Sequence, residues 1–130
     1  MENCLFCRII RGEIPSRRVY EDKDSVAFLD INPANPGHTL VMPKKHAENI
    51  FDADDELLGR VIVAAKVISK KIKESLNADG INVIQNNGRH AGQIVNHIHF
   101  HIIPRFANDT VIISYPQIKM EDKDFEEIQK

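Results

Sequence analysis

The chain has 130 residues, a formal net charge of −2, 42% hydrophobic residues and 28% charged residues. A chain of this length forms one compact domain and buries roughly two-thirds of its unfolded surface, so it needs no disulfide bonds for stability. We expect neither nucleic acid nor a membrane as partner, because the sequence has no basic stripe and no apolar run long enough for a membrane span. Residues 1–4 show neither the basic nor the apolar part of a secretory signal, which predicts a cytoplasmic protein.

The first 43 residues predict a short helix followed by three strands. The helix covers residues 4–11 and stops at Gly12. Strands are predicted over residues 17–21, 26–30 and 38–43. Residues 22–25 form the turn of a hairpin, and residues 31–37 form a loop because they contain two prolines and a glycine.

The remaining residues predict one long helix and two further strands. Apolar residues recur at helical spacing from Asp54 to Leu76. Strands over residues 81–86 and 95–104, a short sixth strand over 110–114 and a terminal helix over 120–129 are also expected. Because most strands are joined by hairpins or short loops, we predict an α+β fold, with an antiparallel sheet and helices against one face.

Three histidines alternate with apolar residues over residues 97–102. Side chains at every second position share one face of a strand, so His97, His99 and His101 should line a common surface while the apolar residues pack inward. Core packing does not explain three adjacent imidazoles, because each has a hydrogen-bond donor and an acceptor to satisfy. The pattern therefore indicates a chemical site.

Two chemistries suit these histidines. The outer two Cα atoms would lie about 13 Å apart on a strand, so only two of the three could hold one metal ion, with a further ligand from elsewhere. Alternatively, a neutral imidazole attacks phosphorus and forms a covalent intermediate, while a second donates to the phosphate oxygens. The glycine-containing loop over residues 86–93 favours phosphate. Asp30, at the end of a strand, either binds ribose hydroxyls or caps a turn.

Cys4 and Cys7 are the only cysteines. They lie too close together in the sequence for a bond between them to stabilise a fold. In a reducing compartment such cysteines serve as metal ligands, redox thiols or small buried residues. A zinc site would need two more ligands.

The combined motifs resemble the histidine triad (HIT) family, whose signature His-φ-His-φ-His-φ-φ, with φ apolar, matches residues 97–103 at every position. Residues 6–15, 27–31, 36–46, 86–88 and 91–93 match as well. The resemblance covers about residues 4–105, favours the Hint branch (histidine triad nucleotide-binding proteins) and leaves residues 106–130 as a C-terminal extension. It implies a single HIT domain over 1–130: a five-stranded antiparallel sheet, one long helix and one or two short helices, with the sheet continued across a homodimer.

The resemblance also implies a hydrolase or transferase for purine nucleoside phosphoramidates or related adenylylated compounds, with no catalytic metal. His99 would be the nucleophile that forms a nucleotidyl-histidine, and His101 would contact the α-phosphate. The other residues implied to bind the nucleotide are Phe6, Ile14, Phe28, Asp30, Ile31, Asn86, Gly92 and Gln93. Core packing is the alternative for the four apolar ones. The alternative functions are a dinucleoside polyphosphate hydrolase and a nucleotide-binding module with negligible turnover.

Bacterial HIT proteins of similar sequence hold a structural zinc with the set that corresponds here to Cys4, Cys7, His46 and His97. If His97 binds zinc, it is not free for phosphate. Two departures from the family bear on the leaving group. Ile94 stands where many Hint proteins have a serine, and the C-terminal residues lack the Trp-Pro tail of the animal proteins. Both departures leave the leaving-group preference open.

Overall fold

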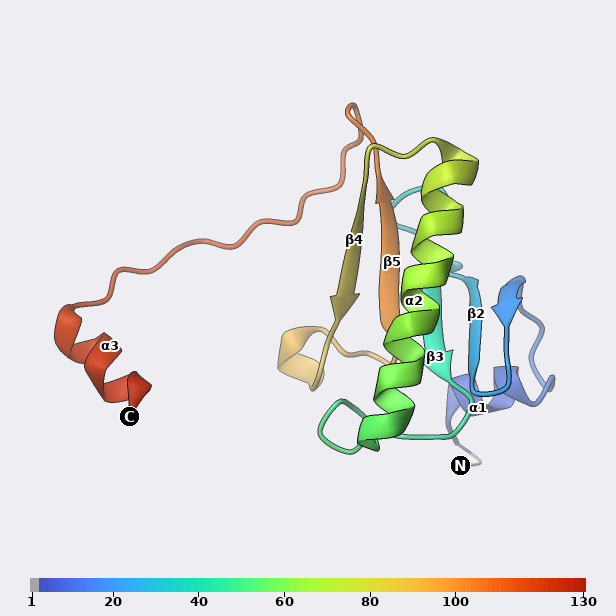
Figure 1. The fold of residues 1–130 in the computed structure, drawn as a ribbon, viewed down its shortest axis with the longest axis horizontal. Helices are drawn as coiled ribbons and strands as arrows, with labels where there is room; N and C mark the ends of the chain where they lie inside the picture. Colours follow the sequence, from blue (N-terminus) through green and yellow to red (C-terminus); the bar gives the residue numbers. More distant parts are fainter. Residues whose placement is uncertain (1–2) are drawn as a thin grey trace.

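The computed structural model describes residues 3–130; Met1 and Glu2, part of the segment expected to lack a secretory signal, lie outside this range. The elements in chain order are α1 (Leu5–Ile10), β1 (Arg18–Glu21), β2 (Ser25–Leu29), β3 (Thr39–Pro43), α2 (Asp55–Leu76), β4 (Gly80–Gln85), the 3₁₀ turn η1 (Arg89–Ala91), β5 (Phe100–Arg105) and α3 (Asp122–Gln129) (Figure 1). Within the described residues, no helix has the length and apolarity that crossing a membrane requires.

The five strands form one antiparallel sheet in the order β1-β2-β3-β5-β4, which confirms the predicted fold class. The chain therefore places β5, its last strand, between β3 and β4. In this register Leu40 of β3 lies opposite Phe28 on one side and His101 on the other. Strands β1 and β4 form the two edges of the sheet.

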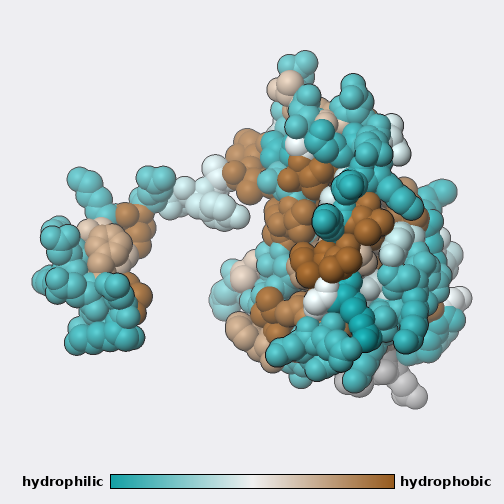
Figure 2. All heavy atoms as spheres, in the orientation of Figure 1, coloured by the Kyte–Doolittle hydropathy of each residue, from teal (hydrophilic) through white to brown (hydrophobic). Residues whose placement is uncertain are grey.

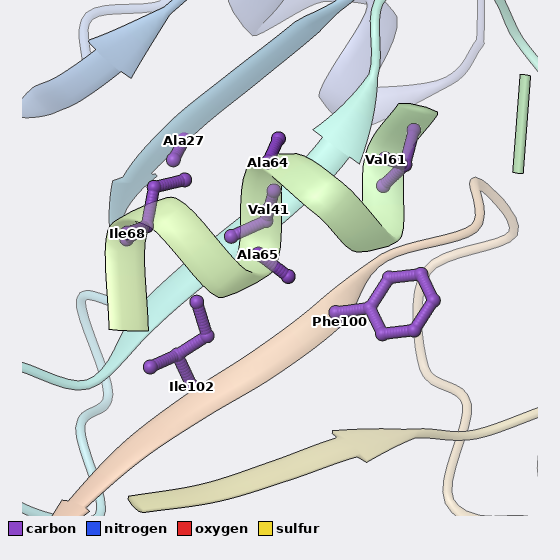
Figure 3. Close-up of a cluster of buried hydrophobic side chains, with 8 residues drawn as sticks. All are labelled: Ala27, Val41, Val61, Ala64, Ala65, Ile68, Phe100 and Ile102. Carbon is purple, nitrogen blue, oxygen red and sulfur yellow. The ribbon is translucent and has the colours of Figure 1, made fainter. Parts of the chain in front are cut away.

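Helix α2 covers one face of the sheet. It starts with Asp55 and Glu56, whose charges suit a helix N-terminus, and ends where Asn77 takes a left-handed conformation with φ of 51°. Its apolar stripe packs on alternate residues of the three central strands (Figure 3). This core cluster consists of Ala27, Val41, Val61, Ala64, Ala65, Ile68, Phe100 and Ile102. The buried state of Ile98, Phe100 and Ile102 confirms that the apolar residues between the histidines point inward.

Helix α1 packs on the opposite face, so the prediction that the helices share one face is wrong. Phe6 and Ile9 of α1 form a second cluster with the intervening strand residues, which are Val26, Phe28, Leu40 and Met42. The reason is that β3 is buried at every position and β2 at four of five. Side chains on both faces of these strands must therefore pack against other elements.

The strand predicted over residues 95–104 begins only at Phe100, and of the three histidines His101 alone lies in it. Phe100 pairs with Gln85, the last residue of β4, and with Val41 of β3, so the residues before it lie beyond the end of β4. The Ile98 N–H instead donates to the carbonyl oxygen of Ala47, at 2.8 Å. The expectation of one strand face carrying all three histidines was therefore wrong.

The C-terminal residues leave the sheet after β5. The sixth strand predicted over 110–114 does not form, because this segment runs alone and pairs with no other strand. The predicted terminal helix is confirmed as α3, which buries none of its residues and stands apart from the sheet (Figure 1). We call residues 112–130 the C-terminal arm.

Candidate active site

The three histidines divide into a pair and a single residue. His99 and His101 lie side by side, with ring centroids 5.1 Å apart, on the face of the sheet that α1 covers. His97 is fully buried, and its ring faces Cys4, Cys7 and His46 instead. The structure thus brings two of the histidines together for chemistry and assigns the third to a separate cluster.

His99 presents one free ring nitrogen. Its Nδ1–H donates to the carbonyl oxygen of His97, at 2.7 Å, so Nε2 keeps the lone pair of the neutral ring. Burial lowers the pKa of His99 below its ordinary value, although the His97 carbonyl and the Asp30 charge oppose this shift. A neutral imidazole with an oriented free lone pair is what a nucleophile requires.

His101 is oriented by a chain of hydrogen bonds that starts at the backbone. The Ala34 N–H donates to Nδ1 of His38, at 2.9 Å, so neutral His38 carries its proton on Nε2. That nitrogen lies 3.0 Å from Nδ1 of His101, which therefore accepts. The His101 proton must then sit on Nε2. Burial and the neighbouring His99 and His38 lower the pKa of His101 to about 4, so its ring is neutral near pH 7.

His38 was not among the site residues predicted from the sequence, where it opens a predicted strand and belongs to the segment 36–46 that resembles the family. The signal for its role is tertiary: His38 lies two residues before Leu40, and Leu40 pairs with His101. The two histidines are therefore diagonal neighbours on one face of the sheet.

Asp30 lies next to His38 and so belongs to the same group of polar residues as His38 and His101. Its Oδ2 lies 3.5 Å from Nε2 of His38, and its Oδ1 accepts from the Asn32 N–H at 2.9 Å, as a turn-capping aspartate does. Possible ligand atoms of Asp30, His38 and His101 all lie within 4.8 Å of one another. However, the Ala34 N–H already occupies the one lone pair of neutral His38. The group is therefore a hydrogen-bonded chain rather than a metal site.

Of the four apolar residues expected around the base, three belong to one cluster. Phe6 and Phe28 are buried and meet edge-to-face at 5.5 Å, and Ile14 packs partly buried against the same cluster. Phe6 also meets the ring of His99 edge-on at 5.0 Å, so it contacts the candidate nucleophile directly. Ile31 is 89% exposed and lies outside this cluster.

Three residues expected to bind the nucleotide, Asn86, Gly92 and Gln93, lie in the loop over residues 86–93. Gly92 has a φ of +99°, a backbone conformation that favours glycine, and an added Cβ would lie 3.4 Å from the side-chain nitrogen of Asn86, an ordinary contact. The buried side chain of Gln93 accepts from the Gly88 N–H and donates to the carbonyl oxygens of Glu48 and Val95. The Gln93 amide therefore holds the loop in place.

Cys4, Cys7, His46 and His97 form a compact cluster. Nδ1 of His97 lies 3.4 Å from Sγ of Cys4, 3.5 Å from Sγ of Cys7 and 3.3 Å from Nδ1 of His46. Ligands of a tetrahedral zinc, at 2.0–2.3 Å from the ion, are separated by about 3.3–3.8 Å. Nε2 of His97 donates to the Pro43 carbonyl oxygen at 2.8 Å, which leaves Nδ1 as a lone pair directed at the cluster.

The chemistry of these donors fits a thiophilic cation. Burial, and then contact with Cys4, raise the pKa of the Cys7 thiol, and burial lowers the pKa of His97 to about 4. Two cysteine thiols and two imidazoles are the Cys₂His₂ set of structural zinc sites, in which the cation displaces the thiol protons. The cluster could therefore bind a metal, and it would tie α1 to the segment that carries the histidines.

Comparison with known proteins places this site in a family. A HIT domain model matches residues 11–108. An HIT-like protein of Methanocaldococcus jannaschii is 50% identical over 121 residues, 93% of this chain and 93% of that one. The adenosine 5′-monophosphoramidase of Saccharomyces cerevisiae is 41% identical over 128 residues, 98% of this chain and 77% of the yeast protein.

Solved structures of similar proteins share the fold of this chain. The crystal structure of SMU.412c from Streptococcus mutans has a TM-score of 0.94 and 40% identity, over 99% of this chain and 82% of that one. A zinc-bound histidine triad family protein from Mycobacterium smegmatis has a TM-score of 0.80 and 39% identity, over 83% of this chain and 78% of that one. With the family model matching most of its length and the histidine pattern complete, this chain belongs to the HIT family.

Proposed function

We propose that this protein is a purine nucleoside phosphoramidate hydrolase that works through a nucleotidyl-His99 intermediate. The observation that carries the proposal is the state of His99: a neutral ring, held at Nδ1 by the His97 carbonyl, with Nε2 free beside His101. The name of the yeast relative, adenosine 5′-monophosphoramidase, supports the same class of reaction.

The proposed reaction has two displacements at phosphorus. Nε2 of His99 forms a bond to phosphorus while the P–N bond of the substrate breaks, and the departing nitrogen takes up a proton. Water then attacks phosphorus, the bond to His99 breaks, and the nucleoside monophosphate leaves. The Nε2–H of His101 donates to the phosphoryl oxygens as their charge grows. AMP-like and GMP-like purine nucleotides are the expected ligands.

The nucleotide-binding residues remain a proposal. Asp30 would accept hydrogen bonds from the ribose hydroxyls, and Asn86 would contact ribose or phosphate. Phe6, Ile14, Phe28 and Ile31 would contact the base, with Gly92 and Gln93 shaping the phosphate loop. The contact between Phe6 and His99 supports a ligand on this side of the sheet.

The test compares turnover of adenosine 5′-phosphoramidate by the wild type, His99→Ala and His90→Ala. His90 is an exposed histidine and serves as the matched control. We expect His99→Ala to lose at least a thousandfold in kcat, because it removes the nucleophile, and His90→Ala to keep wild-type turnover. Mass spectrometry after an alkaline quench should detect the nucleotidyl adduct in the wild type alone. Equal turnover by all three proteins would disprove the role of His99.

A second candidate function is nucleotide binding with negligible turnover. The observation that favours it is Ile94, which is 93% exposed and presents an apolar side chain where many Hint proteins have a serine. Tight AMP binding by calorimetry together with undetectable hydrolysis of the phosphoramidate would select this candidate.

Turnover of Ap₃A or Ap₄A exceeding that of the phosphoramidate would select a dinucleoside polyphosphate hydrolase.

The Cys₂His₂ cluster is proposed to bind one structural zinc per chain. The zinc would hold α1 against the start of the histidine segment and takes no part in the displacement steps. Metal analysis should find about one zinc per wild-type chain and less than half of that in Cys7→Ser, with His90→Ala unchanged. Cobalt should give the thiolate charge-transfer absorption in the wild type, and its absence would exclude this ligand set.

We further propose a homodimer in which the free edges of β4 from two copies pair and continue the sheet. Exposed apolar residues lie on α2 (Ile62) and on β4 itself (Val83), whereas Val63 and Val67 of α2 lie beside Tyr20 of β1, at the other edge of the sheet. Figure 2 shows apolar residues gathered over this side of the molecule. A free strand edge next to an apolar patch favours association with a like edge.

A further inference from the structure

The two cysteines of the Cys₂His₂ cluster differ in their access to solvent. Cys4 is half-buried and lines a cavity of about 710 Å³ together with His46 and Ile94. Because Ile94 is 93% exposed, this cavity opens to the surface of the molecule. Cys7 is buried, with 7% of its surface exposed. A small solute that enters the cavity therefore meets the sulfur of Cys4 first.

The sulfurs of Cys4 and Cys7 are close enough to bond after rotation of their side chains. All four ligand atoms of the cluster, both Sγ atoms included, lie within 4.8 Å of one another. Sγ of Cys4 accepts from the Cys7 N–H at 3.4 Å, so it already lies beside the residue that carries the second thiol. Disulfide oxidoreductases close a disulfide across the same Cys-X-X-Cys spacing. The two thiols are therefore a candidate redox pair as well as candidate metal ligands.

The same sulfurs connect α1 to the histidine segment. Sγ of Cys4 lies 3.4 Å from Nδ1 of His97, and Sγ of Cys7 lies 3.5 Å from the same nitrogen and 3.4 Å from Nδ1 of His46. The thiolate is the form of cysteine that binds a metal, and a sulfur in a disulfide has no thiolate charge. A bond between the two cysteines would therefore remove both sulfur ligands from the cluster at once.

Helix α1 also contacts the candidate nucleophile. Phe6 lies between the two cysteines in the sequence, and its ring meets the ring of His99 at 5.0 Å and that of His97 at 6.0 Å. The His97 carbonyl oxygen in turn accepts the Nδ1–H of His99, at 2.7 Å. A displacement of α1 or of His97 would therefore act on His99 through direct contacts.

We propose that peroxides convert Cys4 and Cys7 into a reversible disulfide, and that this bond expels the metal from the cluster and loosens α1 beside His99. The loss of metal rests on the proposed zinc site, and the effect on nucleotide binding rests on the proposed function. The disulfide itself depends on neither. The cluster would thus act as a peroxide-sensitive switch for the neighbouring site.

The reaction consumes one peroxide for each pair of cysteines. The Cys4 thiolate attacks a peroxide oxygen, so that an S–O bond forms, the O–O bond breaks and hydroxide leaves, which protonation turns into water. The Cys7 thiolate then attacks the Cys4 sulfur, the S–S bond forms, the S–O bond breaks and a second water leaves. The two sulfurs lose two electrons, and the peroxide gains them. A dithiol reductant restores both thiols by exchange.

The first test follows the bond and the metal in the wild-type protein. Equimolar hydrogen peroxide is added to the reduced, zinc-loaded protein, a chromogenic chelator reports free zinc, and peptide mass spectrometry locates the oxidation. We expect a Cys4–Cys7 disulfide, release of zinc in step with it, and recovery of both thiols with dithiothreitol. Oxidation of methionine alone, or a disulfide that leaves the zinc bound, would overturn the proposal. If the reduced protein holds no zinc, the proposed zinc site fails by itself, and the disulfide is still read from the peptide masses.

A matched pair of variants tests which sulfur reacts first. Cys7→Ser keeps the sulfur that faces the cavity, Cys4→Ser keeps the buried sulfur, and each variant lacks one ligand of the cluster. Dimedone traps the sulfenic acid that peroxide forms on the remaining cysteine. We expect labelling of Cys4 in the first variant to be about tenfold faster than labelling of Cys7 in the second, because access limits the attack. Equal rates would contradict the attack by Cys4.

The third test asks whether the disulfide acts on the neighbouring site. Calorimetry compares AMP binding by the oxidised and the reduced wild type, and Cys4→Ser/Cys7→Ser treated with the same peroxide controls for oxidation elsewhere. We expect binding about threefold weaker or more in the oxidised wild type, recovery on reduction, and no response to peroxide in the double variant. Equal affinities of the two forms would overturn the coupling to His99.

The coupling and the proposed function can fail separately. Binding of AMP that depends on the disulfide, without hydrolysis of the phosphoramidate, would disprove the proposed function alone. If AMP binds neither form, the proposed ligand is wrong, and the coupling is read from the imidazole NMR signals of His99, which should shift between the oxidised and the reduced protein. Unchanged signals would overturn the coupling.

Discussion

At the scale of single residues, hydrogen bonds decide which nitrogen of each histidine does chemistry. The His97 carbonyl leaves Nε2 of His99 as a lone pair, and the chain from Ala34 through His38 leaves Nε2 of His101 as a donor. Side by side, the two rings offer a lone pair and a hydrogen-bond donor. The backbone therefore sets the protonation pattern of the site.

This pattern predicts a positioning role for His38. In His38→Ala, Nδ1 of His101 loses its donor, so the ring can adopt the tautomer that presents no proton to the phosphate. We expect kcat to fall roughly ten- to a hundredfold, the size of a partial loss of acid–base assistance, with a smaller change in KM. His38→Gln, whose amide can still donate, should retain more activity.

The tautomer itself can be observed. Nitrogen-15 NMR of the imidazoles should show the proton of His101 on Nε2 in the wild type and a mixture of tautomers in His38→Ala. If His101 stays on the same tautomer in the variant, His38 does not orient it, whatever the activity.

At the scale of elements, the loop before β3 is shaped by its contact with the end of α2. Gly37 has a φ of +89°, and an added Cβ would overlap Cδ1 of Leu76 and lie 3.1 Å from Cγ of Pro104. The close packing of this glycine under the last turn of α2 holds the loop next to His38. A side chain here would meet both an unfavourable backbone conformation and a steric clash.

We predict that Gly37→Ala lowers the free energy of unfolding by about 2 kcal/mol, from backbone strain together with the clash. Gly12→Ala is the matched control, because Gly12 has a similar φ of +82° and nothing within 4 Å of an added Cβ. It should cost only about 1 kcal/mol, the strain alone. Urea denaturation measures both, and adding Leu76→Ala to Gly37→Ala should recover part of the excess. Equal losses for the two glycine variants would refute the contact with α2.

At the scale of the whole molecule, burial of neutral histidines makes stability depend on pH. The pKa of His101 is about 4 in the folded chain, against 6.5 for an ordinary histidine. Between these values the unfolded chain binds more protons than the folded one, so protonation favours unfolding. The stability that neutral His101 contributes is present above pH 6.5 and is lost as the pH falls towards 4.

We therefore predict that the free energy of unfolding falls by about 2 kcal/mol more in the wild type than in His101→Gln between pH 7 and pH 5. Few carboxylates titrate in this interval, and any loss of metal affects both proteins alike, so the difference isolates His101. Urea denaturation at the two pH values gives the measurement. Parallel losses in the two proteins would mean that His101 is not held neutral by the fold.

The sequence by itself determined the class of fold and predicted which histidines are the reactive groups. Antiparallel strands, the long helix and the inward-facing Ile98, Phe100 and Ile102 follow from local patterns, because periodicity reflects which face an element buries. The family followed from the histidine pattern. Element ends were predicted within one or two residues, except in the histidine segment.

Only the tertiary structure decided how the histidines divide their roles. Strand β5 starts at Phe100, opposite the last residue of β4, and before it the Ile98 N–H donates to the carbonyl oxygen of Ala47; no local pattern records these distant partners. The His97 ring therefore faces the cysteines, while His38, 63 residues before His101, contacts the ring of His101. The separation of the C-terminal arm from the sheet also became visible only in the folded chain. The apolar residues of the arm do not show by themselves whether they pack on the sheet of the same chain. Contacts between residues far apart in the sequence depend on packing, and packing is what local pattern leaves out.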